Sequence, residues 1–252
     1  MTDAPSPAGA GPIALVGSGE FLPAMEAVDA ALLAGRPARA VFLPTAAGEE
    51  GPERVAYWLR LGTDHYRRLG AEPVPLAVLD RRDADDEKLA AQVAGVGLIY
   101  LSGGNPGYLA DTLRGTAVLD AILAAWRNGA ALAGCSAGAC ALTAVADDTR
   151  TGVARPGLGV VPGLVVLPHF DRIEQWRPGI VAARAAGLGP GQTLVGIDED
   201  TALISDDAGL TSDDAGGWTV EGCGQVWLLA PDGRRTGHAA GARVAFAPRA
   251  GK

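Results

Sequence analysis

The sequence has little of what marks secreted, membrane or nucleic-acid-binding proteins. It holds only three cysteines in 252 residues, an odd count that implies no disulfide framework and fits a reducing compartment. No apolar run reaches the roughly 18 residues of a membrane-spanning helix. Lys and Arg (21) are fewer than Asp and Glu (29), and this acidic balance argues against nucleic acid or anionic membrane as a partner. We therefore expect a cytoplasmic protein without either partner.

The N-terminus also lacks the basic start and apolar run of a signal peptide. Residues 1–11 consist mainly of Pro, Ala, Gly and Ser, and we expect them to form a short disordered lead. The apolar fraction of 48% is ordinary for a globular protein, and a chain of this length can bury a full core. Residues 12–252 are therefore predicted to form a single domain.

Apolar runs alternate with segments of helical spacing along the chain. The apolar runs predict strands at 12–16, 40–43, 74–79, 96–101, 129–133, 159–167, 193–197 and 202–205. The helical spacing predicts helices at 24–34, 52–69, 85–93 and 108–128, the last with a candidate break at Gly115-Thr116. A hairpin over residues 218–229 is expected to close the sheet edge. This alternation predicts an α/β fold with three layers, α/β/α, and a mostly parallel central sheet.

The strongest chemical signal follows the strand predicted at 129–133. Residues 134–138 read Gly-Cys-Ser-Ala-Gly and precede a helix-compatible stretch, which is typical of a nucleophile elbow with Ser136 at its tip. The turn is tight, so its flanking residues must be small, and the amide of Ala137 would face a developing oxyanion. The alternative is a glycine-rich turn that only packs a helix on a strand. Cys135 precedes the tip and should point into the sheet as a small buried hydrophobe.

Histidines and acids supply candidates for the groups that would activate this serine. His169 ends an apolar strand, where a base could reach the elbow, whereas His65 and His238 are predicted to lie on the surface. Residues 198–200 are Asp-Glu-Asp between two short strands, and one carboxylate could orient the imidazole. A solvated acidic turn is the alternative interpretation. Asp148, shortly after the elbow helix, is a rival acid.

A double glycine, Gly103-Gly104, follows the strand predicted at 96–101. It lets the backbone approach a substrate closely, and Gly104 is the candidate for a second oxyanion amide. No His-x-x-x-His or Cys-x-x-Cys pair has the spacing of metal ligands, so neither a metal nor another cofactor is expected. Residues 17–19, Gly-Ser-Gly, lack the third glycine of a dinucleotide-binding loop.

The order and spacing of these motifs resemble those of the S51 serine peptidases, which include aspartyl dipeptidases and cyanophycinases. The resemblance covers nearly the whole chain, through residues 13–21, 100–105, 134–138, 167–170, 196–202 and 218–222. It implies a fold like the class I glutamine amidotransferases, with Ser136 as nucleophile and His169 as general base. It matches Glu199 to the orienting acid of the cyanophycinases, while some dipeptidase patterns point to Asp148. It also implies a homodimer as one option for assembly.

The segment around His169 departs from the cyanophycinase pattern. Leu167-Pro168 stand where cyanophycinases have acidic and amide residues, and the arginines that follow have a different spacing. The triplet at 168–170 is nearer the dipeptidase pattern, whereas the acidic stretch at 198–200 leans toward the cyanophycinases. Arg172 is a candidate for binding a substrate carboxylate, with a solvated loop arginine as the alternative. Asn105 is a second candidate for substrate binding.

We therefore predict a serine-type peptidase, in particular an exopeptidase or dipeptidase, that hydrolyses short peptides through Ser136, His169 and Glu199 and an acyl-enzyme. The expected partner is a small peptide or amide, with an acidic residue beside the scissile bond as one option. Two alternatives stay open. One is another amide or ester hydrolase, or a cyanophycinase-like isopeptidase, on the same site. The other is a non-catalytic binding protein on this scaffold, whose signature would be a disrupted triad.

Overall fold

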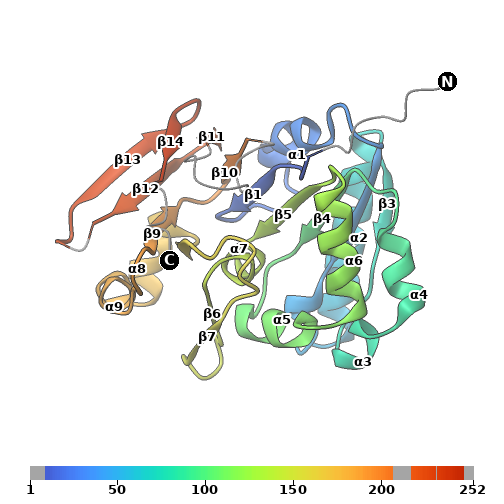
Figure 1. Cartoon of the computed structure of the whole chain (residues 1–252), viewed down its shortest axis with the longest axis horizontal. Coiled ribbons are helices and arrows are strands. Elements are labelled where there is room, and N and C mark those ends of the chain that lie inside the picture. Colours follow the sequence, from blue (N-terminus) through green and yellow to red (C-terminus); the bar gives the residue numbers. More distant parts are fainter. Residues whose placement is uncertain (1–8, 207–216, 231, 247–252) are drawn as a thin grey trace.

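The computed structural model describes residues 9–206, 217–230 and 232–246 (Figure 1). Most of the expected N-terminal lead, residues 1–8, lies outside these ranges. Gly11 is fixed on both sides by Trp126: its N–H donates to the Trp126 carbonyl at 3.0 Å, and its own carbonyl accepts from Trp126 Nε1 at 2.8 Å.

Within the described residues, a central sheet of eight strands organises the fold, in the order β14-β11-β10-β1-β5-β4-β2-β3. Its five parallel strands are β1 (Ile13–Val16), β2 (Arg39–Leu43), β3 (Glu72–Pro75), β4 (Leu98–Leu101) and β5 (Ala131–Cys135). Three antiparallel strands extend one edge: β10 (Thr201–Ser205), β11 (Gly217–Gly222) and β14 (Arg243–Ala245). The register pairs Val16 with Cys135 and Leu101 with Gly134, so β1, β4 and β5 end level with one another. Their carboxyl ends therefore meet at one edge of the sheet, where sites form in folds of this kind.

Helices cover both faces of this sheet because its strands are apolar on both sides. On the face of Ala14 and Val16 pack α1 (Glu26–Leu33), α2 (Pro52–Arg68) and the short 3₁₀ segment η1 (Pro23–Met25). On the face of Ile13 and Leu15 pack α3 (Arg81–Ala84), α4 (Glu87–Ala90), η3 (Ala91–Val93), α5 (Pro106–Leu113), α6 (Ala117–Arg127) and α7 (Ala137–Leu142). The predicted three-layer fold with a mostly parallel sheet is thereby confirmed. The break within residues 108–128 is also present, since α6 begins after Thr116, whose hydroxyl caps it.

A second, four-stranded sheet lies on one side of the central sheet (Figure 1). Its order is β13 (Arg235–Ala239), β12 (Gln225–Leu229), β9 (Thr193–Ile197) and β8 (Leu164–Leu167). Two helices, α8 (Phe170–Trp176) and α9 (Ile180–Ala186), pack on it around a small core of their own. A two-stranded ribbon of β6 (Val145–Asp147) and β7 (Ala154–Pro156) follows α7. No apolar run in the sequence predicts either strand of this ribbon.

The hairpin expected at 218–229 is wrong. β11 and β12 follow each other in the chain but belong to different sheets: β11 pairs with β10 and β14, and β12 pairs with β9 and β13. The connection at 223–224 runs beside the β9–β10 connection at 198–200, held by Cys223 N–H to Asp200 O (2.8 Å) and Asp198 N–H to Gln225 O (3.1 Å). Gly222, at φ 104°, turns the chain in a conformation that glycine favours. The connections at 198–200 and 223–224 therefore run side by side from one sheet to the other, and we call residues 198–200 the crossing segment.

His65 is fully buried, so its predicted surface position is also wrong. It lies on the inner face of α2, and its Nε2 is 2.7 Å from Asp29 Oδ2 of α1, with both side chains at 0% exposure. The rings of Phe21 and Tyr66 pack around it. A histidine in the middle of a helix predicts a surface position, because the sequence does not show that a carboxylate from another helix meets it. His238 is half-buried on β13.

Candidate active site

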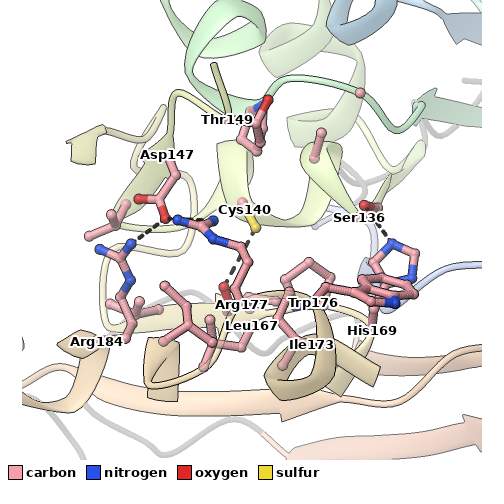
Figure 2. Close-up of a pocket in the computed structure, with 18 residues that line it drawn as sticks. Ser136, Cys140, Asp147, Thr149, Leu167, His169, Ile173, Trp176, Arg177 and Arg184 are labelled. Carbon is pink, nitrogen blue, oxygen red and sulfur yellow. Dashed lines mark hydrogen bonds and ion pairs between the residues drawn. The ribbon is translucent and has the colours of Figure 1, made fainter. Parts of the chain in front are cut away.

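Ser136 occupies a sharp turn between β5 and α7, at the level carboxyl ends of the parallel strands. Its backbone has φ 50° and ψ −104°, a conformation that non-glycine residues rarely adopt. The Ser136 N–H donates to the Val16 carbonyl at 2.9 Å, which ties the turn to β1. Ser136 lines a pocket with its side chain toward His169 (Figure 2). This strand–turn–helix geometry is that of a nucleophile elbow.

The glycines on both sides of Ser136 are required by close backbone packing. A Cβ on Gly134 would lie 2.5 Å from the Gly138 backbone, and a Cβ on Gly138 would lie 2.2 Å from the Leu101 carbonyl oxygen. Real Cβ atoms do not approach backbone this closely, so any larger residue would push α7 away from β4 or β5. A larger residue at either position therefore fits only if the neighbouring backbone is displaced.

His169 brings its ring to Ser136 from the end of β8 in the second sheet. Its Nε2 lies 3.0 Å from Ser136 Oγ and its Nδ1 lies 2.8 Å from Glu199 Oε1. The residue has φ 50° and ψ 40° and precedes α8, so its backbone is also in the left-handed region. The Trp176 ring, from the end of α8, packs 5.3 Å from the imidazole between centroids (Figure 2). The three predicted side chains thus form one continuous hydrogen-bonded relay.

The three acids at 198–200 have three different positions, and only Glu199 meets His169. Asp198 accepts from Gln225 N–H (2.9 Å) and Trp227 Nε1 (3.0 Å), so it fastens the crossing segment to β12. Burial raises the pKa of Asp198 above its ordinary value of 3.8. Asp200 takes φ 53° and turns the chain into β10.

Glu199 is itself held from α8. Its backbone N–H donates to Asp171 Oδ1 at 3.0 Å, and its carbonyl accepts from the Thr201 hydroxyl at 2.9 Å. Sequence reasoning missed Asp171, although it lies two residues after His169, because an acid in the first turn of a helix is ordinary.

Asp148, the rival acid, lies elsewhere. It accepts from Asn105 Nδ2 (3.2 Å) and from the Arg150 N–H (2.9 Å), and Arg155 lies 3.6 Å away. The hydrogen bond from the Arg150 backbone, assisted by Asn105, holds the pKa of Asp148 below its ordinary value of 3.8. Asp148 therefore stabilises the loop in which it lies.

The two predicted oxyanion amides flank Ser136 in the same pocket. Ala137 begins α7, so its N–H has no acceptor within the helix. Gly104 has φ 138°, and a Cβ on it would lie 2.4 Å from the Ala46 carbonyl oxygen, so only glycine fits there. The Gly104 N–H has no hydrogen-bond partner in the part of the chain that the structure describes. Both N–H groups are therefore unpaired within the described residues, and both residues line the pocket of Ser136.

The pocket is a cavity of about 160 Å³ with an apolar middle and a charged far end (Figure 2). Its apolar walls come from Val145, Val165, Leu167, Ile173 and Ile180. At the end away from His169, Asp147 accepts a hydrogen bond from Arg184, and Arg177 lies 3.8 Å from the same carboxylate oxygen. Two guanidinium groups face one carboxylate, so this end carries a formal excess of positive charge. We call Asp147, Arg177 and Arg184 the arginine end.

The two residues predicted to bind substrate do not line this pocket. Asn105 caps α5 by accepting from Tyr108 N–H at 3.3 Å, and its amide holds Asp148. Arg172 is 54% exposed and pairs with its neighbour Asp171 at 3.3 Å. Arg184 was missed, although one arginine within the otherwise apolar helix Ile180–Ala186 was an available signal.

The two cysteine thiols near Ser136 are buried, and the pKa of each is raised. Cys135 donates to Glu20 Oε2 at 2.9 Å on the side of β5 that packs against α1 and α2, and burial followed by the Glu20 charge raises its pKa well above the ordinary 9.0. Burial raises the pKa of Cys140, in the pocket wall, to about 12. A thiol nucleophile needs a lowered pKa, so serine is the better nucleophile here.

Two further findings bear on the class of protein. Within residues 9–206, 217–230 and 232–246, no three or more His, Cys, Asp or Glu side chains are grouped so that they could hold a metal ion. No helix in those same ranges has the length and apolar character needed to cross a membrane.

Comparison with known proteins agrees with the site. The model of peptidase family S51 matches residues 13–212. Cyanophycinases from Synechococcus elongatus and Thermosynechococcus vestitus are each 31% identical over 153 residues, which cover 56% of this chain and 47% of the cyanophycinase. The match thus spans about half the length of these curated relatives.

Solved structures extend the likeness to the whole fold. A peptidase from an acI-B1 actinobacterium superposes with a TM-score of 0.84 at 36% identity, covering 96% of this chain and 99% of that one. A putative peptidase E from Listeria monocytogenes EGD-e shares the fold, with a TM-score of 0.59 at 16% identity over 85% of this chain and 99% of that one.

The fold and the elbow site define a hydrolase of the serine type. The chain belongs to peptidase family S51, and its class is that of the serine-type peptidases.

Proposed function

We propose that this protein hydrolyses short peptides with Ser136 as nucleophile, His169 as general base and Glu199 as the acid that orients the histidine. The relay from Ser136 Oγ through both nitrogens of His169 to Glu199 carries this proposal, with links of 3.0 and 2.8 Å. Each link lies within the range expected for a nucleophile, its base and the group that orients the base.

The geometry supports an acyl-enzyme route. Ser136 Oγ attacks the scissile carbonyl carbon while its proton passes to His169 Nε2, and Glu199 stabilises the imidazolium that forms. The N–H groups of Ala137 and Gly104 hold the negative oxygen of the tetrahedral intermediate. His169 then gives the proton to the leaving amine, and the C–N bond breaks. Water, deprotonated by His169, attacks the acyl-enzyme and releases the acid and Ser136.

The arginine end supports a preference for a substrate with a carboxylate. It lies in the same small cavity as Ser136, separated from it by apolar walls (Figure 2). Guanidinium groups bind carboxylates through paired hydrogen bonds, and the apolar surroundings strengthen that attraction. We therefore propose a peptide with an acidic residue beside the scissile bond. The cavity volume of about 160 Å³ favours a short peptide over a folded chain.

A panel of dipeptides and small esters tests this function. We expect Asp-X and Glu-X dipeptides to be hydrolysed faster than Ala-X and Leu-X, and Ser136→Ala to abolish all turnover. Arg184→Met should lower kcat/KM for the acidic dipeptides by about 10–100-fold, because a charge-assisted contact contributes about 1.5–3 kcal/mol.

The same panel separates the alternatives. Neutral dipeptides should change little in Arg184→Met, and an equal loss for both kinds would contradict the role of the arginine end. Hydrolysis of esters without dipeptides would favour an esterase. Cyanophycin is added to the panel, and its hydrolysis without dipeptide hydrolysis would favour a cyanophycinase-like isopeptidase. Binding of peptides without turnover would favour a non-catalytic protein.

A further inference from the structure

Glu20 is a buried acidic residue that the proposed mechanism does not use. It ends the turn 17–20 after β1 and is only 7% exposed. An acidic side chain is rarely buried unless its oxygens have partners. Its partners therefore indicate what it does.

Both oxygens of Glu20 are engaged at the back of the site. Oε1 accepts from the Gly103 N–H at 2.9 Å, and Oε2 accepts from the Cys135 thiol at 2.9 Å. The raised pKa of Cys135, caused by burial and then by Glu20, keeps this thiol protonated as a donor. One carboxylate therefore joins the end of β4 to the end of β5.

In the sequence, each of the two partners of Glu20 directly precedes a residue of the proposed site. Gly103 precedes Gly104, and Cys135 precedes Ser136. Gly103 lies between Glu20 and the nucleophile, since a Cβ on it would be 2.7 Å from Glu20 Oε1 and 3.5 Å from Ser136 Cβ. Because Glu20 takes the Gly103 N–H, the Gly103–Gly104 segment is fixed while the Gly104 N–H stays available.

We propose that Glu20 is a positioning residue that holds the Gly104 amide and Ser136 at a fixed separation. The proposal rests on the function proposed above. Glu20 touches neither the substrate nor the relay, since its oxygens are taken by Gly103 and Cys135. It acts through the backbone of the two strands, and a displacement of about 1 Å at such a site can cost about 100-fold in rate.

Glu20 is itself held rigidly. Phe21, the next residue, has φ 64° and packs in a buried cluster with Phe42, Tyr66 and Tyr100. In the described ranges, four non-glycine residues have positive φ: Phe21, Ser136, His169 and Asp200. Three of them are in the relay or adjoin it, and the fourth adjoins Glu20. Strained backbone clusters at functional sites, which agrees with a place for Glu20 in the site.

The turn 17–20 also touches the segment that carries Glu199. A Cβ on Gly17 would lie 2.1 Å from the Asp198 carbonyl oxygen, and a Cβ on Gly19 would lie 2.1 Å from Asp200 Oδ1. The turn thus packs against three segments at once: the ends of β4 and β5 and the crossing segment at 198–200. This arrangement makes it the common support of the oxyanion site and the relay.

Two substitutions separate shape from charge at this position. Glu20→Gln keeps the length of the side chain and an oxygen for the Gly103 N–H, and its amide faces the Cys135 sulfur, a weak acceptor. Glu20→Asp keeps the charge but is one methylene shorter, so it cannot reach both partners. Glu26→Asp is the matched control, because Glu26 pairs with Arg68 at the surface of α1.

The rate of fluorophosphonate labelling and the kcat and KM for an acidic dipeptide are measured for each variant, with thermal unfolding to verify folding. We expect Glu20→Asp to lower both labelling rate and kcat by about 10–100-fold with KM within about 3-fold, as for a misplaced oxyanion donor. Glu20→Gln and Glu26→Asp should stay within about 3-fold of wild type. A folded Glu20→Asp protein with the wild-type rate, or Glu20→Gln as slow as Glu20→Asp, would overturn the proposal.

Crystal structures of the Glu20 variants give a readout that does not depend on activity. The Gly103–Gly104 peptide should move in Glu20→Asp and keep its place in Glu20→Gln. An unmoved peptide in Glu20→Asp would overturn the positioning role even in an active enzyme. Absence of labelling in wild type would instead defeat the proposed function, and the peptide position would still decide what Glu20 holds.

Discussion

Replacing Glu199 with glutamine keeps the shape of the side chain and changes what it offers to His169. The carboxylate accepts the Nδ1–H of His169 at 2.8 Å, which leaves Nε2 free to take the proton of Ser136 Oγ at 3.0 Å. A glutamine amide can donate to Nδ1 instead, and the ring proton then sits on Nε2. In that tautomer His169 cannot accept the serine proton.

The expected loss follows from how exposed the pair is. In serine proteases the corresponding acid-to-amide change lowers kcat by about 10⁴. Here the His169 and Glu199 side chains are 24% and 35% exposed, so water can replace part of the interaction. We therefore expect Glu199→Gln to lower kcat by about 10²–10³, equivalent to about 2.7–4.1 kcal/mol of transition-state stabilisation.

Steady-state hydrolysis of the best dipeptide measures this effect, with Asp148→Asn as the matched control. Asp148 closes its own loop, so its substitution should leave kcat within about 2-fold, as expected of a change away from the reacting groups. Glu199→Gln with more than about a third of wild-type kcat would show that Glu199 does not orient His169 for catalysis. A large loss in Asp148→Asn alone would move the orienting role to that residue.

Three predictions concern stability. Gly138→Ala should lower the free energy of unfolding, measured with urea, by about 1–3 kcal/mol, because its Cβ would lie 2.2 Å from the Leu101 carbonyl oxygen. The control Gly187→Ala, whose Cβ would have its nearest atom at 3.6 Å, should leave the free energy of unfolding unchanged. Equal urea midpoints for the two variants would contradict this. Asp29→Ala should lower the free energy of unfolding by about 3–5 kcal/mol, because it leaves buried His65 without its partner. Asp29→Asn should lower it distinctly less. Urea unfolding measures both variants, and similar losses would show that the contact between Asp29 and His65 is unimportant. For Asp148, a pKa below the ordinary 3.8 means that its charge stabilises the fold above that pH and that this contribution is lost as the pH falls through the lower folded value. Wild type should therefore have a higher Tm than Asp148→Asn at about pH 7, and a gap that persists unchanged at about pH 3 would oppose this.

The sequence predicted those parts of the structure whose signals are local. The apolar runs of β1, β2, β4 and β5 and the Gly-Cys-Ser-Ala-Gly elbow each specify their own conformation within a few residues. The relay residues were also predicted by number, because the elbow, a strand-end histidine and an acidic turn each stand out individually. The structure places their side chains in contact.

What the sequence could not provide depends on contacts between distant segments. Asp29 meets His65 across 36 residues, and Glu20 meets Gly103 across 83 residues. The hairpin prediction failed for the same reason, because β11 and β12 find partners in two different sheets rather than in each other. The arginine end likewise depends on how α8 and α9 pack over β8, which no local pattern reports.

The identity of the nucleophile is measured directly by fluorophosphonate labelling followed by peptide mass spectrometry, comparing wild type with Ser136→Ala and Cys135→Ala. We expect one modified residue, Ser136, with labelling lost in Ser136→Ala and still detected in Cys135→Ala. Labelling that survives in Ser136→Ala, or that is lost only in Cys135→Ala, would contradict the assignment of Ser136 as nucleophile.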